Sequence, residues 1–322
     1  MALQNPTGSR MPLVGALILM LFLLAMAAAV WSSMGASPPP HPGGNLEPPA
    51  LSKPETIRLG SGRTVTKMDP ARDYIIQFPP ERKMGATVLM GGHNVVIMGG
   101  QISVPSDDKT RRALFIKGAT GTVHVEGVLV DNPQNTEFDA IVVAAPDATV
   151  QLQNIRVEGL RGFQNSWHAD ILQPWGGVRS LRINGLTGIT GYQGIQLSSL
   201  KGQIKDISLR RVNLRSTDPQ IWSSGANGGN GGYLFWADCT LTAQVSLDQV
   251  YLSPRQERRA DQVAWPTPST KSKCASKLSR SDSVITFPAL PIKGEMHIGV
   301  PPQGDFVPAG SAGLRYRPSP KR

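Results

Sequence analysis

Two kinds of short apolar segment alternate along the middle of the chain. The first kind includes RALFIKG at 112–118 and DAIVVAA at 139–145, and the second includes VHVEGVLV at 123–130 and VQLQNIRV at 150–157. In the second kind apolar residues tend to recur at every other position, which is the period of a strand with one buried face. We expect six such strand pairs between residues 86 and 252, and YIIQFPP at 74–80 resembles an earlier coil.

The spacing of these segments predicts the fold class. Within each series most starts lie 24 to 31 residues apart. That interval is too short for a crossover helix at every step, and a strand-only repeat of this length indicates a solenoid. A β-sandwich would also show many short strands, but it would lack this paired order at near-constant spacing. The pattern therefore predicts an all-β parallel β-helix over residues 56–252.

The amino terminus carries an uncharged apolar run at residues 11–30. Twenty apolar residues span a bilayer core of about 30 Å. Arg10 precedes the run, so the positive-inside rule places residues 1–10 in the cytoplasm and the rest of the chain outside it. We expect a single-pass anchor in the cell membrane. The alternative is a cleaved signal peptide, which the small residues Ala27 to Ala29 would suit, and the protein would then be secreted.

Two further segments flank the predicted solenoid. Residues 31–55 are rich in Pro and Gly, which is typical of an extended linker. Residues 253–322 begin as a basic loop rich in Pro and Ser. Strand-like patterns return at 283–288 and 294–300. Together with the tail, these segments could cap the exposed edge of the stack. Whether the amino-terminal run is an anchor or a signal peptide, we expect the solenoid to be periplasmic or extracellular.

The net charge indicates which class of partner to expect, and the two cysteines bear on the redox compartment. The formal net charge is +10, much of it in the basic loop, which favours anionic partners. Outside the cytoplasm we expect an acidic polysaccharide or an anionic lipid surface rather than nucleic acid, and a solvated loop without a partner is the plain alternative. Cys239 and Cys274 could form a disulfide in an oxidising compartment, or stay as two unpaired thiols.

The strongest candidate for chemistry is WHADILQPW at 167–175. On a strand, His168 and Asp170 share one face, and an inward Ile171 would place both outward. An imidazole with an ordinary pKa near 6.5 suits a general base. The plain alternative is a structural hydrogen bond that fixes the turn before the strand.

The coil spacing and the stretch HADILQPWGG at 168–177 resemble the pectate-lyase-like right-handed parallel β-helix superfamily, in particular bacterial β-helix proteins with H-x-D strands. The resemblance covers about residues 60–300. It implies a polysaccharide lyase in which Arg182 or Arg179 neutralises a uronate carboxylate, His168 with Asp170 takes the proton, and Tyr192 supplies one. The superfamily also contains inert structural members, so a non-catalytic glycan-binding or envelope scaffold protein is the alternative.

A larger set of polar and aromatic residues is expected to contact the glycan: Trp167, Gln173, Trp175, Arg179, Gln193, Gln196, Trp222, Tyr233 and Trp236. Trp222 lies in a Gly-rich insertion at 217–232. Hydrolysis would instead need two carboxylates about 5–10 Å apart, and the sequence aligns neither Asp139 nor Asp238 securely with Asp170. Because no cluster of acidic residues is present, we expect no metal and no cofactor.

Overall fold

The computed structural model describes residues 45–164, 166–217, 231–256, 258–281 and 283–318. The chain divides into two units, Met1–Gly44 and Asn45–Arg322, and the second is described below. The predicted cytoplasmic tail, the apolar run and most of the linker lie outside the described residues. Within the described residues, no helix is long and apolar enough to cross a membrane.

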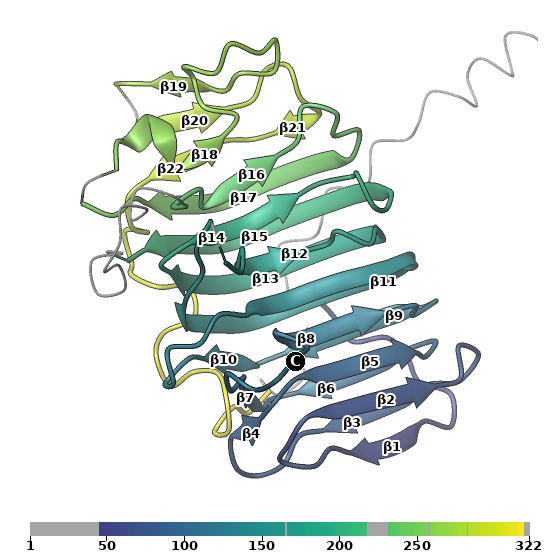
Figure 1. The fold of residues 1–322 in the computed structure, drawn as a ribbon. Helices are drawn as coiled ribbons and strands as arrows, with labels where there is room; N and C mark the ends of the chain where they lie inside the picture. Colours follow the sequence, from purple (N-terminus) through teal and green to yellow (C-terminus); the bar gives the residue numbers. More distant parts are fainter. Residues whose placement is uncertain (1–44, 165, 218–230, 257, 282, 319–322) are drawn as a thin grey trace, which may run out of the picture. The chain divides into compact units, whose positions relative to one another are not determined.

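Strands make up nearly all of the regular structure, and most pair in parallel with the strand one coil later (Figure 1). Sheet B contains β2 (Thr64–Met68), β5 (Thr87–Gly91), β8 (Arg112–Lys117), the start of β11 (Asp139–Leu160), β12 (Asp170–Gln173), β14 (Gln193–Leu197), β16 (Phe235–Ala237) and β18 (Ala264–Trp265). This all-strand, mostly parallel arrangement fits a β-helix and confirms the predicted solenoid at that level.

Sheet A contains the second strand of each coil. Its members are β1 (Glu55–Arg58), β3 (Tyr74–Gln77), β4 (Lys83–Met84), β6 (Val95–Met98), β7 (Gln101–Ser103), β9 (Thr122–Glu126), β10 (Leu129–Asp131), the rest of β11, β13 (Val178–Thr190), β15 (Ile204–Ser216) and β17 (Gln244–Ser253). The repeat extends to β1 and β2, before the earliest coil that the pattern at 74–80 indicated.

Stacking in register builds the core. Leu152 on β11 pairs with Ile183 on β13, which pairs with Leu209 on β15. All three side chains are buried, so apolar rows run continuously from coil to coil, as alternation in the strand pattern requires. Sheet A bends where Asn154 and Arg211 adopt left-handed backbone conformations with φ of 51° and 52°. Asn tolerates this conformation better than most residues.

The carboxyl-terminal part extends sheet A and then returns along it. β21 (Ile292–Lys293) and β22 (Met296–Ile298) pair in parallel with β17, while β20 (Val284–Thr286) pairs antiparallel with β22 and with β19 (Lys277–Ser279). Residues 299–318, here called the C-terminal strap, then run back past earlier coils (yellow in Figure 1). The Val307 N–H donates to Thr187 Oγ1 at 3.0 Å, and the Gly313 N–H donates to the Gly127 carbonyl at 2.8 Å.

Part of the predicted linker also contacts the stack. The Leu46 N–H donates to Gln153 Oε1 at 2.5 Å, and the Ser52 N–H donates to Asp73 Oδ2 at 2.7 Å. Composition alone indicated an extended spacer here. Residues 45–54 contain no strand, but these hydrogen bonds attach them to sheet A.

Candidate functional site

One row of side chains on sheet B passes from coil to coil in register. The row, here called the sheet B ladder, consists of Phe115, Val142, Gln173, Gln196, Trp236 and Trp265. Neighbouring strand positions such as Leu114, Ile141, Leu172, Ile195 and Phe235 are buried in the core. Alternation along each strand therefore directs the ladder to the outer face of sheet B. Val142 is buried, whereas the other five side chains are partly exposed.

Aromatic rings gather at the carboxyl-terminal end of the ladder. The Trp236 and Trp265 rings stack with centroids 5.2 Å apart, and Tyr233 meets both edge-on at 5.4 and 5.8 Å. The Arg258 guanidinium lies 4.5 Å from the Tyr233 ring centroid. Flat, partly exposed rings with a cation beside them form a surface on which a sugar ring can pack.

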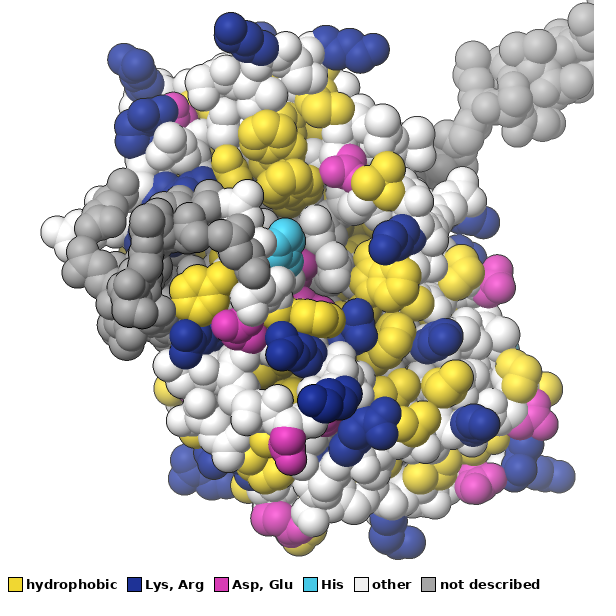
Figure 2. Space-filling view, viewed as in Figure 1, with side chains coloured by type: hydrophobic (Ala, Val, Ile, Leu, Met, Phe, Trp, Pro, Cys, Tyr) yellow, Lys and Arg dark blue, Asp and Glu magenta, His cyan; other side chains and the backbone are white. Residues whose placement is uncertain are grey.

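A second aromatic contact lies further along the same face. The Phe115 and Trp175 rings are 6.5 Å apart, and the Lys201 ammonium lies 5.6 Å from the Trp175 centroid. Gln173 and Gln196 hydrogen bond to each other between the two aromatic groups. Figure 2 shows exposed hydrophobic side chains interspersed with Lys and Arg on the face that Figure 1 presents.

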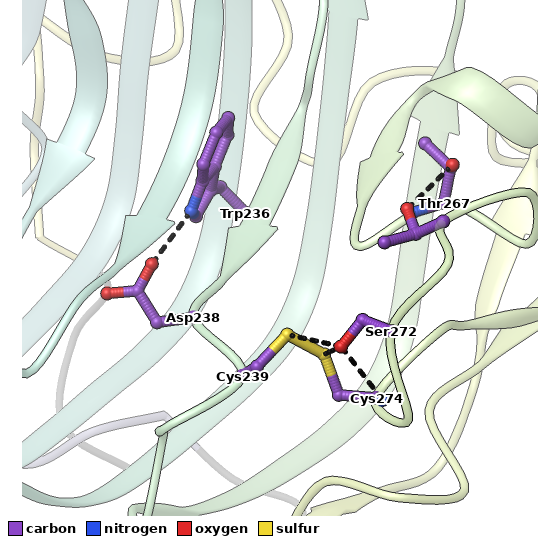
Figure 3. The surroundings of a disulfide bond; sticks show 7 residues. Trp236, Asp238, Cys239, Thr267, Ser272 and Cys274 are labelled. Carbon is purple, nitrogen blue, oxygen red and sulfur yellow. Dashed lines mark hydrogen bonds between the residues drawn. A yellow bond between two sulfur atoms is a disulfide. The ribbon is translucent and has the colours of Figure 1, made fainter.

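A disulfide lies next to the Trp236 end of the ladder (Figure 3). Cys239 follows β16 and is bonded to Cys274, with their Cα atoms 5.6 Å apart. The Trp236 Nε1–H donates to Asp238 Oδ1 at 3.0 Å. The disulfide therefore connects the turn after Trp236 to a turn in the segment that follows Trp265.

His168 lies in a loop before β12. Its side chain is exposed, its Nε2 lies 2.6 Å from the Gln164 carbonyl oxygen, and its ring is 5.6 Å from the Tyr192 ring. An Nε2–H that donates to this carbonyl leaves Nδ1 as the nitrogen available to other groups. This contact joins two residues of the same loop.

Asp170 does not share the exposed surface of His168. The sequence placed both side chains outward, but Asp170 is fully buried, as is Ile171. Asp170 lies on the same side of β12 as the core residue Leu172. Its backbone N–H donates to Asp139 Oδ1 at 3.0 Å, which fixes this orientation at the start of the strand.

Asp139 and Asp170 form a buried carboxyl pair, although the sequence did not align them. The pairing of Ile141 with Leu172 places the two acids in register on β11 and β12. Burial raises the pKa of Asp139 to about 7, against the opposing effects of the Asp170 N–H and of Arg112, whose Nε lies 3.8 Å from Asp139 Oδ2. Burial and then the charge of Asp139 raise the pKa of Asp170 well above its ordinary value. The pair therefore retains a proton near neutral pH.

The remaining predicted catalytic residues are dispersed. Arg182 lies on β13 in sheet A, paired with Gln151 and Ser208, and Arg179 contacts Thr149 of the same sheet at 3.5 Å. Neither arginine is therefore on the sheet that carries Asp170. Tyr192 is buried beside His168, and burial followed by the charge of Asp170 raises the pKa of its hydroxyl to about 12.

Apart from Arg179 on sheet A, the predicted contact residues separate into three groups. Gln173, Trp175, Gln196, Tyr233 and Trp236 lie together on or beside the sheet B ladder. Gln193 is buried and pairs with Asp170, while Trp167 is partly buried in the His168 loop. Trp222 lies outside the described residues.

Sequence reasoning missed several residues of this face: Phe115, Trp265, Lys201, Arg111, Arg112 and Arg258. Phe115 alternates with the buried residues Leu114 and Ile116, so its outward direction was readable from the strand pattern. Trp265 was harder to find, because β18 has two residues and lies in the segment interpreted as a basic loop.

No protein-family model matches this chain, and neither a curated protein nor a solved structure is significantly similar to it. Among the described residues, no group of three or more His, Cys, Asp or Glu side chains could hold a metal ion. The geometry of sheet B is therefore the main basis for a functional proposal. Its aromatic, amide and cationic groups can bind an extended polar chain.

Proposed function

We propose that this protein binds an extended acidic glycan along the outer face of sheet B. The observation that carries the proposal is the sheet B ladder, in which amide side chains and stacked aromatic rings follow one another across the four coils from Gln173 to Trp265. Adjacent coils lie about 4.8 Å apart, so the row matches a ligand that repeats along one direction. Aromatic faces pack against the apolar faces of sugar rings, while amides hydrogen bond to hydroxyls.

Cations next to the rings favour an acidic ligand. Arg112 lies 5.3 Å from the Phe115 ring centroid, Lys201 lies beside Trp175, and Arg258 lies beside Tyr233. The net charge of +10 adds a long-range attraction that salt would weaken.

The wider setting is part of the same proposal. We propose a right-handed β-helix of the pectate-lyase-like kind, exported from the cytoplasm and attached to the membrane through residues 11–30, or secreted after cleavage. The Cys239–Cys274 disulfide supports an oxidising location, because such bonds are rare in the cytosol.

The structure favours binding over β-elimination. An eliminating enzyme needs a neutralising cation and a base on the same sugar. Arg182 and Arg179 are on sheet A, Asp170 is buried, and His168 Nε2 already contacts the Gln164 carbonyl. The predicted catalytic set is therefore not assembled around one accessible point.

Titration calorimetry on the full chain with uronate oligosaccharides tests the proposal. Trp236→Ala should weaken binding about tenfold or more, because it removes one of two stacked rings. Tyr251→Ala is the matched control, since Tyr251 stacks on His297 of sheet A with centroids 5.0 Å apart. Equal losses from both variants would count against a site on sheet B. Ultraviolet-absorbing unsaturated products appearing in the same mixtures would instead support the lyase.

A further inference from the structure

A pocket of about 560 Å³ opens beside the His168 loop, at the start of strands β8 and β11. Its walls are mostly polar and include Arg111, Arg161, Asn135, Glu137 and Ser166. None of these residues belongs to the sheet B ladder. The pocket nevertheless adjoins it, because Arg111 directly precedes Arg112, which lies beside Phe115.

Each arginine of this pocket is held against an aromatic ring. The Arg111 guanidinium lies 5.5 Å from the Trp167 ring centroid. The Arg161 guanidinium lies 4.9 Å from the Phe163 centroid, and its Nη1 donates to the Asn135 carbonyl at 3.1 Å. A guanidinium fixed in this way loses less side-chain entropy when it binds a ligand.

The backbone at Arg111 is strained. Arg111 has a φ of +47°, in the left-handed region that side chains larger than Gly or Asn rarely adopt. Two hydrogen bonds hold it there: its N–H donates to the Asp108 carbonyl at 3.2 Å, and its carbonyl accepts the Asp139 N–H at 3.0 Å. Glycine would satisfy this conformation without strain.

The acidic residue of the pocket, Glu137, accepts hydrogen bonds from the loop before β12. Glu137 Oε2 accepts the Trp167 N–H at 3.2 Å and also accepts the Ser166 hydroxyl. Glu137 thereby positions Trp167, the ring that supports Arg111. The loop, the ring and the guanidinium form one connected wall.

We propose that this pocket binds the carboxylate groups of the glycan, with Arg111 and Arg161 as the residues that distinguish an acidic sugar from a neutral one. The inference rests on the proposed glycan-binding function and assigns its charge selectivity to one place. Guanidinium groups suit planar carboxylates because two parallel N–H bonds match two oxygens. β11 and β16 are three coils apart, about 14 Å along the stack, so one oligosaccharide can contact both the pocket and Trp236.

The test compares two probes on the full chain: a uronate oligosaccharide and its fully methyl-esterified, uncharged counterpart of equal length. The wild type should bind the acid more tightly than the ester. Arg111→Gln should weaken binding of the acid about tenfold or more and change binding of the ester less than about twofold. Lys109→Gln, an exposed cation two residues away, is the control with the same change of charge.

A second variant serves as the control for misfolding. Arg111→Gly relieves the left-handed strain while removing the guanidinium, so it should fold at least as well as the wild type and lose the same selectivity. An equal loss with Lys109→Gln, or equal losses for acid and ester, would overturn the assignment of selectivity to Arg111. Tight binding of the ester with no preference for the acid would overturn this inference alone. Failure of the wild type to bind either probe would overturn the glycan function and this inference with it.

Discussion

The outer faces of the two sheets differ in which groups contact and hydrogen bond to their side chains. On sheet A the protein's own chain supplies the partners: Tyr316 donates its hydroxyl to Glu126, and Arg156 Nη1 lies 2.9 Å from Asp305 Oδ2. On sheet B the ladder residues contact one another and nearby cations. The same stacking of coils therefore gives one face occupied by an internal strap and another that presents rings and amides to a ligand.

Removing the disulfide should have the largest effect, and it should act on the sheet B side. Cys274→Ser opens a covalent link between residues 35 positions apart. A link of this kind contributes typically about 2–4 kcal/mol to the free energy of unfolding. Denaturant unfolding should show that loss, and glycan affinity should fall as well because the segments that follow Trp236 and Trp265 are no longer joined. Unchanged stability in the variant would show that the bond adds nothing to the fold.

Displacing the C-terminal strap should affect sheet A and leave sheet B intact. Gly127 has a φ of +69°, and a Cβ added there would lie 2.1 Å from the Tyr316 ring. Gly127→Ala should therefore push the strap outward and cost about 1–3 kcal/mol. Limited proteolysis should cut the strap faster, while glycan affinity stays within about twofold. A large loss of glycan affinity would mean that the two faces are not independent.

The buried acids predict a pH dependence. The pKa of Asp139 is raised to about 7 and that of Asp170 well above its ordinary 3.8. The unfolded chain therefore loses these protons first, so stability should fall as pH rises from about 4 to at least 7. Asp170→Asn cannot ionise and removes part of this penalty. Its stability relative to the wild type should rise by about 1 kcal/mol or more between pH 5 and pH 8. A difference that is constant over that range would contradict the shared-proton account.

The fold was more predictable than the site. Alternation in VQLQNIRV and its counterparts determined which residues face the core, and the constant interval between coils indicated parallel stacking. The orientation of Asp170 was predicted wrongly, because Ile171 and Leu172 are both buried and the pattern does not show which of the two sets the inward face of the strand. Arg182 was assigned by its proximity in sequence to His168, although the chain turns into sheet A between them.

Some features had only weak sequence signals. The strap contacts residues more than 100 positions earlier, and its segment reads as a Pro- and Gly-rich tail. The pocket on Arg111 and Arg161 joins residues from three successive turns, none of which forms a motif. Contacts of this kind follow from the register between coils, and the pattern within one coil does not specify them.

The most direct test of the account is the indole spectrum of the ¹⁵N-labelled full chain during titration with a uronate oligosaccharide. The chain has six tryptophans, so single Trp→Phe variants can assign each Nε1–H signal. The account predicts saturable shifts of the Trp236 and Trp265 signals, which report on the stacked rings of sheet B. Saturating ligand that leaves both signals unmoved would contradict a glycan site on this face.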